Sequence, residues 1–476
     1  MFKFTKIVAT IGPACADEKT LTQMVKAGVN VARLNFSHGT YASHKKLMNN
    51  IRKVEKSTGV PVAILQDLQG PKIRLGNLPE KGLEIKTGSK VVFDTSIKEY
   101  KGKELPVAYS GLQKFLKAGQ HFLLDDGHMS VKIEKISGSK IYCQVIEGER
   151  LTSHKGLNFP DSVLKIPSLS KKDIADLEFG VKAGVEFVAL SFVHTAEDIL
   201  RLRALIKKFE KKLKIKKQAP ILIIAKIEQH EAVENIDEIL DVVDCIMVAR
   251  GDLGLETAEA GVPVIQKTII AKARAKAKMV IVATQMLDSM QHNRIPTRAE
   301  VSDVANAVID HTDAVMLSNE SASGDFPVLT VKTMAEIVRT TEASPFDDLP
   351  TPAPTKESDL SAITELSRAL SFEVGSKLIV ADSISGETAR LIVRVRPQVP
   401  ILVATNSLRV QRQLNLSWGV MPFIIQRARH VEDFIKNAVE YIKKNKLAKK
   451  GDKIVVVAGD PVGQESKVNL VEIKEI

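Results

Sequence analysis

The sequence has few cysteines, few aromatic residues and no long hydrophobic run. Its 476 residues include only three cysteines, Cys15, Cys143 and Cys245, and their scattered positions fit neither a disulfide framework nor a zinc site. No apolar run approaches the roughly 20 residues that span a bilayer. Asp17 and Glu18 follow soon after the first strand-like run, which is not typical of a secretion signal. These absences predict a cytoplasmic protein with no membrane partner.

Positive charge exceeds negative charge, with 68 lysines and arginines against 57 aspartates and glutamates. Such an excess can indicate nucleic-acid binding. The lysines concentrate, however, in two runs, 207–217 and 443–453, which carry apolar residues at helical spacing, and no zinc-finger or RNA-binding signature accompanies them. We interpret both runs as solvated helix faces and expect no nucleic-acid partner.

Eight short aliphatic runs recur along the first two-thirds of the chain. The intervals between their starts are 24, 32, 124, 34, 24, 35 and 34 residues, and all but one match the strand–helix repeat of a (β/α)8 TIM barrel. The runs are Ile7–Thr10, Val31–Leu34, Ala63–Asp67, Phe187–Ser191, Ile221–Lys226, Cys245–Ala249, Val280–Thr284 and Ala314–Ser318.

The one long interval implies an insertion after the third run. Between residues 71 and 166 polar and apolar residues alternate and turns contain glycine, which predicts an antiparallel β-barrel lid domain. A proline-rich segment, 345–354, follows the barrel, and the remainder alternates helix-like and strand-like runs. The predicted class is α/β: a barrel from 1–70 and 167–344, a lid from 71–166, and an open α/β domain from 345–476.

Polar residues follow all eight runs, at the edge where a barrel of this kind carries its active site. The fifth and sixth runs would bring Lys226 and Glu228 beside Gly251 and Asp252. Two carboxylates beside an ammonium suit a hard divalent cation together with a phosphate or enolate oxygen. Taken alone, this stretch could equally be a surface salt-bridge cluster. The polar ends of the other six runs favour a functional site.

Cations are numerous at this predicted edge. Arg33, Lys72 and Arg74 suit a phosphorylated or carboxylated ligand. Phosphoryl transfer depends mainly on positioning and charge neutralisation, and these residue types supply both. The sequence has no GxxxxGK[ST] motif, so a nucleotide would be held in another way.

Long stretches of the chain closely resemble the motifs of the pyruvate kinase family. They are KIVATIGPA (6–14), VARLNFSHG (31–39), GPKIR (70–74), KIEQHEAVENIDEIL (226–240), IMVARGDLGLE (246–256), VATQMLDSM (282–290) and PTRAEVSDVANAV (296–308), with DDG (125–127) and KGLNFP (155–160) in the insertion. The resemblance covers nearly the whole chain. It implies the same three-part fold, a homotetramer, and a reaction that converts phosphoenolpyruvate and ADP to pyruvate and ATP.

The resemblance also implies roles for single residues. Glu228 and Asp252 would bind Mg²⁺, or Mn²⁺ in its place. Lys226 would steady the transferring phosphoryl group and the developing enolate. Arg33 would contact the phosphoryl group and ADP.

The remaining roles concern the substrate carboxylate and the nucleotide. The backbone of Gly251 and Asp252 and the Thr284 hydroxyl would receive the carboxylate, and Thr284 would also lie on the proton route to the enolate carbon. As alternatives, Thr284 could cap the next helix and His38 could be a packed histidine. The residues expected near the nucleotide phosphates are Asn35, His38, Arg74 and Lys155, with Asp126 closing from the lid.

One segment departs from the pattern of those family members that need K⁺. They hold the ion near equivalents of Asn35, Ser37 and Asp67, with a threonine after the aspartate and a glutamate further on. Here those two residues are Leu68 and Lys72, as in the K⁺-independent branch. Because a tethered ammonium can supply the charge of the ion, we expect K⁺ not to be required.

Two further departures concern loops. Ser318-Asn-Glu-Ser321 stands where the family usually has Ser-Gly-Glu-Thr, and because asparagine tolerates a left-handed backbone, the loop is expected to keep its shape. In the C-terminal domain, Ser383, Ser385 and Thr388 could hold an effector phosphate at a helix start. Glu387 and a final loop (459–467) without tryptophan or arginine count against fructose 1,6-bisphosphate, so an effector site and a purely structural loop both stay open.

Two other functions fit part of the sequence. A Mg²⁺-dependent aldolase that forms a pyruvate enolate would share the metal site, but the inserted lid and the full motif set count against it. A catalytically inactive regulator or a basic nucleic-acid binder would be expected to have lost Lys226, Glu228 or Thr284, and the sequence retains all three.

Overall fold

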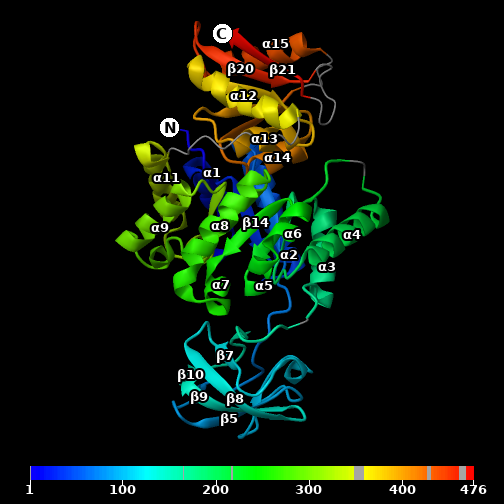
Figure 1. Ribbon diagram of the computed structural model, residues 1–476, viewed down its shortest axis with the longest axis vertical. Helices are drawn as coiled ribbons and strands as arrows, with labels where there is room; N and C mark the ends of the chain where they lie inside the picture. Colours follow the sequence, from blue (N-terminus) through cyan, green and yellow to red (C-terminus); the bar gives the residue numbers. More distant parts are fainter. Residues whose placement is uncertain (1, 165, 216–217, 348–358, 426–429, 460–467) are drawn as a thin grey trace.

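The computed structural model describes residues 2–164, 166–215, 218–347, 359–425, 430–459 and 468–476. Three parts follow one another along the long axis of the molecule, with the barrel between the inserted domain and the C-terminal domain (Figure 1). Most of the proline-rich segment and of the final loop considered above lie outside the described residues. In the described part of the chain, no helix is long and apolar enough to cross a membrane.

The central part is a closed barrel of eight parallel strands, and each predicted run is a strand to within one residue. Alternate strand residues such as Val8, Met247 and Ile281 fill the interior, whereas Ile7, Ile246 and Val282 pack against the outer helices. The strands are β1 (Lys6–Thr10), β2 (Val31–Asn35), β3 (Ala63–Asp67), β12 (Phe187–Leu190), β13 (Leu222–Ile227), β14 (Cys245–Ala249), β15 (Met279–Ala283) and β16 (Ala314–Leu317).

Several barrel helices begin at polar caps. Asp17 caps α1, and Ser170 with Asp173 forms the capping box of α3. Asn319 is the first residue of the short helix α10 and has no left-handed backbone, and whether the loop keeps the family's shape stays a prediction. The helices are α1 (Glu18–Ala27), α2 (Tyr41–Thr58), α3 (Lys171–Ala183), α4 (Ala196–Lys212), α5 (His230–Glu234), α6 (Ile236–Val242), α7 (Arg250–Glu256), α8 (Val262–Ala275), α9 (Arg298–Ile309), α10 (Asn319–Ala322) and α11 (Pro327–Glu342).

The inserted domain packs a six-stranded sheet around its own aromatic core. Phe122 contacts both Phe93 and Phe159, with ring centroids 5.1 Å apart in each pair. The sheet is antiparallel except between β5 and β6, and a two-stranded ribbon joins β4 to β10. The strands are β4 (Leu83–Glu84), β5 (Lys90–Asp94), β6 (Leu105–Pro106), β7 (His121–Leu124), β8 (Met129–Ser137), β9 (Lys140–Glu147), β10 (Arg150–Leu151) and β11 (Leu157–Asn158).

The C-terminal domain is a five-stranded sheet with apolar clusters on both faces. Its order is β19-β18-β17-β20-β21, and only the β21 edge is antiparallel. The elements are α12 (Asp359–Glu373), β17 (Leu378–Asp382), α13 (Glu387–Arg394), β18 (Ile401–Thr405), α14 (Leu408–Leu414), β19 (Val420–Ile424), α15 (Val431–Lys444), β20 (Lys453–Ala458) and β21 (Leu470–Glu475). The sequence patterns did not predict β19 or β21.

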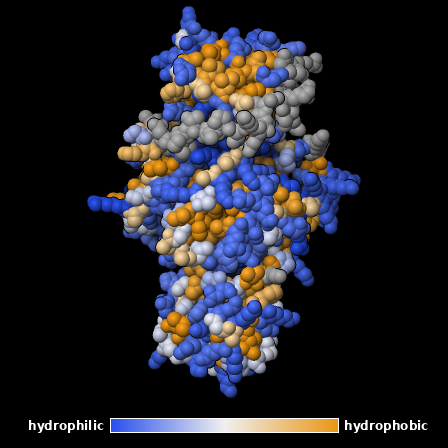
Figure 2. Space-filling model, viewed as in Figure 1, coloured by the Kyte–Doolittle hydropathy of each residue, from blue (hydrophilic) through white to orange (hydrophobic). Residues whose placement is uncertain are grey.

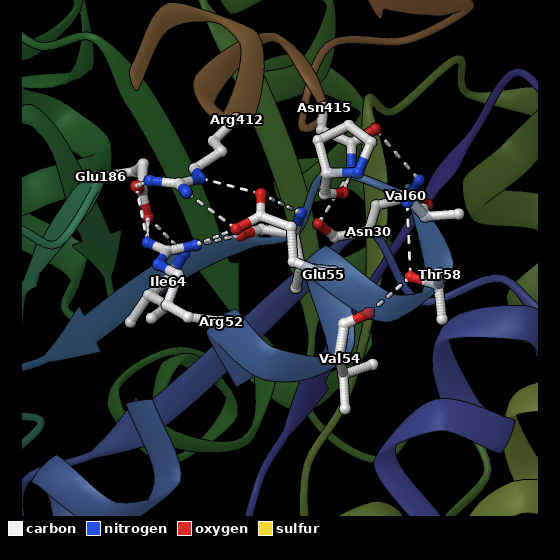
Figure 3. Close-up of polar contacts among 12 residues, drawn as sticks. Asn30, Arg52, Val54, Glu55, Thr58, Val60, Ile64, Glu186, Arg412 and Asn415 are labelled. Carbon is white, nitrogen blue, oxygen red and sulfur yellow. Dashed lines mark hydrogen bonds and ion pairs between the residues drawn. The ribbon is translucent and has the colours of Figure 1, made fainter. Parts of the chain in front are cut away.

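The C-terminal domain closes the N-terminal end of the barrel. Leu416, just after α14, is fully buried in the same cluster as the barrel interior. Beside it, Arg412 pairs with Glu55 at 2.8 Å and with Glu186 at 3.3 Å, and Arg52 pairs with Glu186 at 2.6 Å (Figure 3). The two contacts of Arg412 join residues more than 200 positions apart, so they fix the C-terminal domain on the barrel.

Candidate active site

Lys226 lies at the centre of a buried charge cluster at the C-terminal ends of the strands. Its Nζ is 2.7 Å from Glu228 Oε1 and 3.6 Å from Asp67 Oδ1, and it donates a hydrogen bond to Ser191 Oγ at 2.8 Å. Burial by itself would lower the pKa of this ammonium, but the carboxylates of Asp67 and Glu228 raise it above its usual value. Lys226 is therefore a fixed positive charge at neutral pH.

Glu228 and Asp252 supply the carboxylates that suit a divalent cation. Burial raises the pKa of Glu228; Lys226 opposes this shift, whereas the charge of Asp252 adds to it. A cation between the two carboxylates would remove that repulsion. In the described part of the chain no group of three or more histidine, cysteine or acidic side chains could hold a metal, so substrate oxygens and water would complete the ligand set.

Lys72 lies against one of these carboxylates. Its Nζ is 3.2 Å from Asp252 Oδ1, and both side chains are about three-quarters buried. The second carboxylate, Glu228, also has partners on both oxygens: Lys226 pairs with Oε1, and the Phe192 backbone N–H donates to Oε2 at 2.8 Å. The ammonium predicted to replace K⁺ thus pairs directly with a predicted metal ligand.

The ends of β14 and β15 join through Thr284. The Gly251 backbone N–H, in the first turn of α7, donates to Thr284 Oγ1 at 2.8 Å. Thr284 has φ = 71°, a strained conformation for a β-branched residue that marks functional sites. The alternative role as a cap is wrong, since the next helical turn begins after Leu287.

Arg33 is fixed where β2 ends. Its Nε donates to Asp67 Oδ2 at 2.8 Å and its Nη1 donates to Thr10 Oγ1 at 2.8 Å. Asn35 lies opposite Asp67 in the strand register, and its Oδ1 accepts a hydrogen bond from the Ser37 backbone N–H. Asn35, Ser37 and Asp67, predicted for the monovalent-cation region, therefore lie close together: Asn35 ends β2, Ser37 follows it, and Asp67 ends the neighbouring strand β3.

The residues predicted for the nucleotide divide between two domains. His38 is exposed at the barrel end, so the packed-histidine alternative does not hold for it. Arg74 donates to the His154 carbonyl at 3.0 Å, and Lys155 pairs with Asp125 at 2.6 Å, both within the inserted domain. No hydrogen bond or ion pair among the described residues joins the two groups.

A cleft separates the tip of the inserted domain from α7. It measures about 690 Å³, and Asp126 lines its outer wall while Gly254 and Glu259 line the barrel side. At the inner end, Asn158 Nδ2 donates to Glu256 Oε1 at 3.2 Å. The inserted domain therefore touches the helix that carries Gly251 and Asp252.

The predicted effector residues lie at the start of α13, with Ser383 and Ser385 before the helix and Thr388 in its first turn. Ser383 is buried, and its Oγ has no hydrogen-bond partner among the described residues. The Glu387 backbone N–H donates to Ser385 Oγ at 3.4 Å, and Gly386 adopts φ = 85°. The final loop that would face them falls at positions 460–467, outside the described residues.

Four residues contribute to the site without having been given roles from the sequence. Ser191 and Phe192 hold Lys226 and Glu228, Thr10 holds Arg33, and Arg250 donates to the Thr284 carbonyl at 2.7 Å. All four follow or end a barrel strand. Position at a strand end was therefore the signal that could have identified them.

Comparisons with known proteins agree along the whole chain. Two protein-family models match: pyruvate kinase, barrel domain, over residues 2–331, and pyruvate kinase, alpha/beta domain, over residues 361–474. A pyruvate kinase of Geobacillus stearothermophilus is 42% identical over 484 residues, covering 100% of this chain and 81% of that protein. One of Clostridium perfringens is 39% identical over 479 residues, covering 99% of both chains. With the barrel, the inserted domain and the α/β domain all in place, the chain belongs to the pyruvate kinase family.

Proposed function

We propose that this enzyme transfers the phosphoryl group of phosphoenolpyruvate to ADP in a Mg²⁺-dependent reaction that yields pyruvate and ATP, the last step of glycolysis. The observation that carries the proposal is the buried Lys226 ammonium, held between Asp67 and Glu228, with Asp252 near enough to Glu228 to raise its pKa. Transfer of a phosphoryl group requires fixed positive charge and accurate positioning more than covalent chemistry.

Glu228 and Asp252 would hold the divalent cation. When bound, the cation would polarise substrate oxygens as a Lewis acid. Mn²⁺ could replace Mg²⁺, because both ions accept carboxylate and water ligands. The chain itself excludes solvent from Glu228, which is buried, and fixes its position through the Phe192 N–H.

Lys226 and Arg33 would stabilise the charge of the phosphoryl group and the enolate. Lys226 stays protonated because the neighbouring carboxylates raise its pKa, so it offers charge without taking part in proton transfer. Arg33 is held in place by Asp67 and Thr10 before any ligand binds. Such preorganised charges are the commonest source of transition-state stabilisation.

Thr284 would receive the substrate carboxylate together with the backbone of Gly251 and Asp252. Its hydroxyl already accepts the Gly251 N–H, so the same side chain ties the ends of two strands together. We assign it also to the proton route toward the enolate carbon. A Thr284→Val variant would keep the shape and remove the hydroxyl, so proton delivery should fail before substrate binding does.

Asn35, His38, Arg74 and Lys155 would bind the nucleotide phosphates when the inserted domain, residues 71–166, moves toward the barrel formed by 1–70 and 167–344. Asp126 would close the cleft from the inserted domain. The open cleft beside α7 supports such a movement.

We further propose that K⁺ is not required. Lys72 supplies a tethered positive charge beside Asp252.

A test measures turnover of phosphoenolpyruvate and ADP with and without Mg²⁺, and with K⁺ replaced by tetramethylammonium. The wild-type rate should depend on the divalent cation and stay close to constant when K⁺ is removed. Lys72→Glu should acquire K⁺ activation of about tenfold, since one charge contact at this distance is worth about 1.4 kcal/mol. Lys72→Met, which removes the charge without reversing it, is the matched control. A strong K⁺ requirement in the wild type, with no new dependence in Lys72→Glu, would contradict the role of Lys72 while leaving the reaction itself intact.

The C-terminal domain, residues 345–476, would assemble a homotetramer. Leu366 and Phe372 on α12 are 55% and 70% exposed, and Ile473 on the edge strand β21 is 44% exposed. Figure 2 shows apolar residues gathered over this domain.

Ser383, Ser385 and Thr388 would bind an effector phosphate. The three buried free cysteines and the glycolytic reaction fit a cytoplasmic location.

A further inference from the structure

A small cavity lies where the inserted domain meets the barrel, beside the end of α7. The inserted domain joins the barrel through two extended connections (Figure 1). The space in the cavity that water can occupy is about 30 Å³. Since one water molecule needs about 10–15 Å³, one or two fit and a larger ligand does not. The lining includes Pro71 and Asn158 from the inserted domain and Phe192, His230 and Glu256 from the barrel.

Three buried polar atoms of this lining have no hydrogen-bond partner in the described part of the chain. They are Asn158 Oδ1, Ser162 Oγ and His230 Nδ1. The first two belong to the inserted domain, and the third belongs to the first turn of α5 in the barrel. Leaving a buried polar group unpaired is costly, and a buried water typically makes about three hydrogen bonds to such groups. Water in the cavity would therefore join the inserted domain to the barrel.

Glu256, beside the cavity, joins the two domains directly. It is the last residue of α7 and is buried. Asn158 Nδ2 donates to Glu256 Oε1 at 3.2 Å, and the Phe159 backbone N–H donates to the same oxygen at 3.3 Å. The Phe159 ring in turn stacks on Phe122 in the aromatic core of the inserted domain. One carboxylate oxygen thus holds the inserted domain close to its core.

The same elements carry the predicted metal ligands. Glu256 lies one turn after Asp252 on α7. Burial raises the pKa of Glu256; the hydrogen bonds from the inserted domain oppose this shift, and the charge of Asp252 adds to it. On the barrel side of the cavity, Phe192 donates its backbone N–H to Glu228, and a Cβ at Gly70 would come within 2.7 Å of the Phe192 ring. The base of the inserted domain therefore packs against residues that adjoin both predicted metal ligands.

We propose that Glu256 is a positioning residue: together with water in the cavity, it holds the inserted domain in one orientation on α7. The inserted domain turns about this contact when it moves, while its tip at Asp126 crosses the open cleft. The consequence for catalysis rests on the proposed function. A fixed orientation brings Arg74 and Lys155 to the nucleotide, whereas a substrate bound by the barrel alone does not depend on it.

The test compares Glu256→Met with Glu256→Gln. Methionine keeps the length of the side chain without a strong acceptor, whereas glutamine keeps an oxygen for both donors. In Glu256→Met the KM for ADP should rise about tenfold, because the orientation that fits the nucleotide would be populated about a tenth of the time. The kcat and the KM for phosphoenolpyruvate should stay close to wild type. Glu256→Gln should keep the wild-type KM for ADP, as should the control Glu234→Met, which changes an exposed glutamate at the end of α5.

Hydrogen exchange follows the same contact without turnover. The backbone amides of residues 157–164 should exchange faster in Glu256→Met than in the wild type or Glu256→Gln. If Glu256→Met does not fold, Asn158→Asp replaces it, because a second carboxylate would repel Glu256. Adding Glu256→Gln to Asn158→Asp should then restore slow exchange, since the glutamine amide can donate to the new carboxylate. The expected exchange in an inactive enzyme would contradict the proposed function and leave the role of Glu256 intact.

Unchanged exchange in Glu256→Met or in Asn158→Asp would overturn the proposal. An equal rise of the KM values for ADP and phosphoenolpyruvate would also overturn it, because that result indicates general damage to the site. A crystal structure of the wild type should show ordered water within hydrogen-bond distance of Asn158 Oδ1 and His230 Nδ1. A dry cavity would overturn the part assigned to water.

Discussion

Both ends of the barrel carry buried charged residues, but the hydrogen bonds and ion pairs of these residues differ between the two ends. At the N-terminal end, the Glu186 carboxylate accepts hydrogen bonds from Arg52, Arg412 and the Ile64 backbone N–H (Figure 3). At the C-terminal end, Asp67 Oδ1 has no hydrogen bond within the described residues and Asp252 has only Lys72 as an ion-pair partner there.

The difference separates charges that hold the fold from charges that await a ligand. Every oxygen of Glu186 is used by groups from the barrel or the C-terminal domain, so adding a ligand there would break existing bonds. Glu228 and Asp252 instead repel each other, and a cation would relieve that repulsion. Removing a charge should therefore cost stability at the first end and activity at the second.

The largest expected effect comes from Glu228→Gln. The change keeps the shape of the side chain but removes the charge that would bind the cation, so kcat should fall about 10³-fold, as when other preorganised charges are removed. The thermal midpoint should stay level or rise, because burial already disfavours the ionised form of Glu228. Steady-state kinetics at saturating Mg²⁺ and a thermal melt measure both quantities.

Glu186→Gln is the matched control at the other end of the barrel. It should lower the thermal midpoint and leave kcat close to the wild-type value, since Glu186 lies beside Arg52 and Arg412 and away from the strand ends. If Glu228→Gln kept more than a tenth of the wild-type kcat while the kcat of Glu186→Gln fell below a tenth, the assignment of the two ends would be wrong.

An intermediate effect is expected from Arg412→Met. The substitution leaves Glu186 and Glu55 with one fewer partner while keeping the apolar bulk, and should cost about 3 kcal/mol of unfolding free energy, the lower part of the range for a broken buried pair. The exposed pair of Lys53 with Glu18 is the control, because Lys53→Met should cost less than about 0.5 kcal/mol. Denaturant titration and kcat are the readouts; a loss of kcat in either variant would contradict a purely structural role.

The strand ends could be predicted from the sequence, whereas the opposite end could not. Eight aliphatic runs at regular intervals define the barrel, and the residue after each run then lies at the active edge whatever the details of packing. The contact of Arg412 with Glu186 joins positions 226 residues apart and depends on how two domains dock, which local patterns do not encode.

The differences between prediction and structure have local physical causes. β19 contains Pro422, which weakens a strand pattern, and β21 is an antiparallel edge strand with exposed polar residues. Asn319 follows a strand end directly and enters a helical turn, so its tolerance of a left-handed backbone is not used. The positive φ of Thr284 is likewise invisible in the sequence, as is the hydrogen bond that its hydroxyl accepts from the Gly251 N–H.

The smallest expected effect is a pH dependence of stability at the N-terminal end of the barrel. Burial, followed by the charges of Arg396 and Arg274, lowers the pKa of His311 to about 3. In the unfolded chain the pKa should be about 6.5, so between these values the unfolded chain binds a proton that the folded protein does not. The contribution of His311 to stability is therefore complete above about pH 6.5 and is lost as the pH falls toward 3.

At pH 5 the contribution of His311 to the free energy of unfolding should have fallen by roughly 2 kcal/mol, at about 1.4 kcal/mol per pH unit below pH 6.5. The measurement is the difference in unfolding free energy between wild type and His311→Gln from pH 7 to pH 5, which removes the contributions of all other groups. The raised pKa of Lys226 adds no slope in this range, since that ammonium is protonated in both states. A slope that is equal in both proteins would show that the cations at this end do not act on His311.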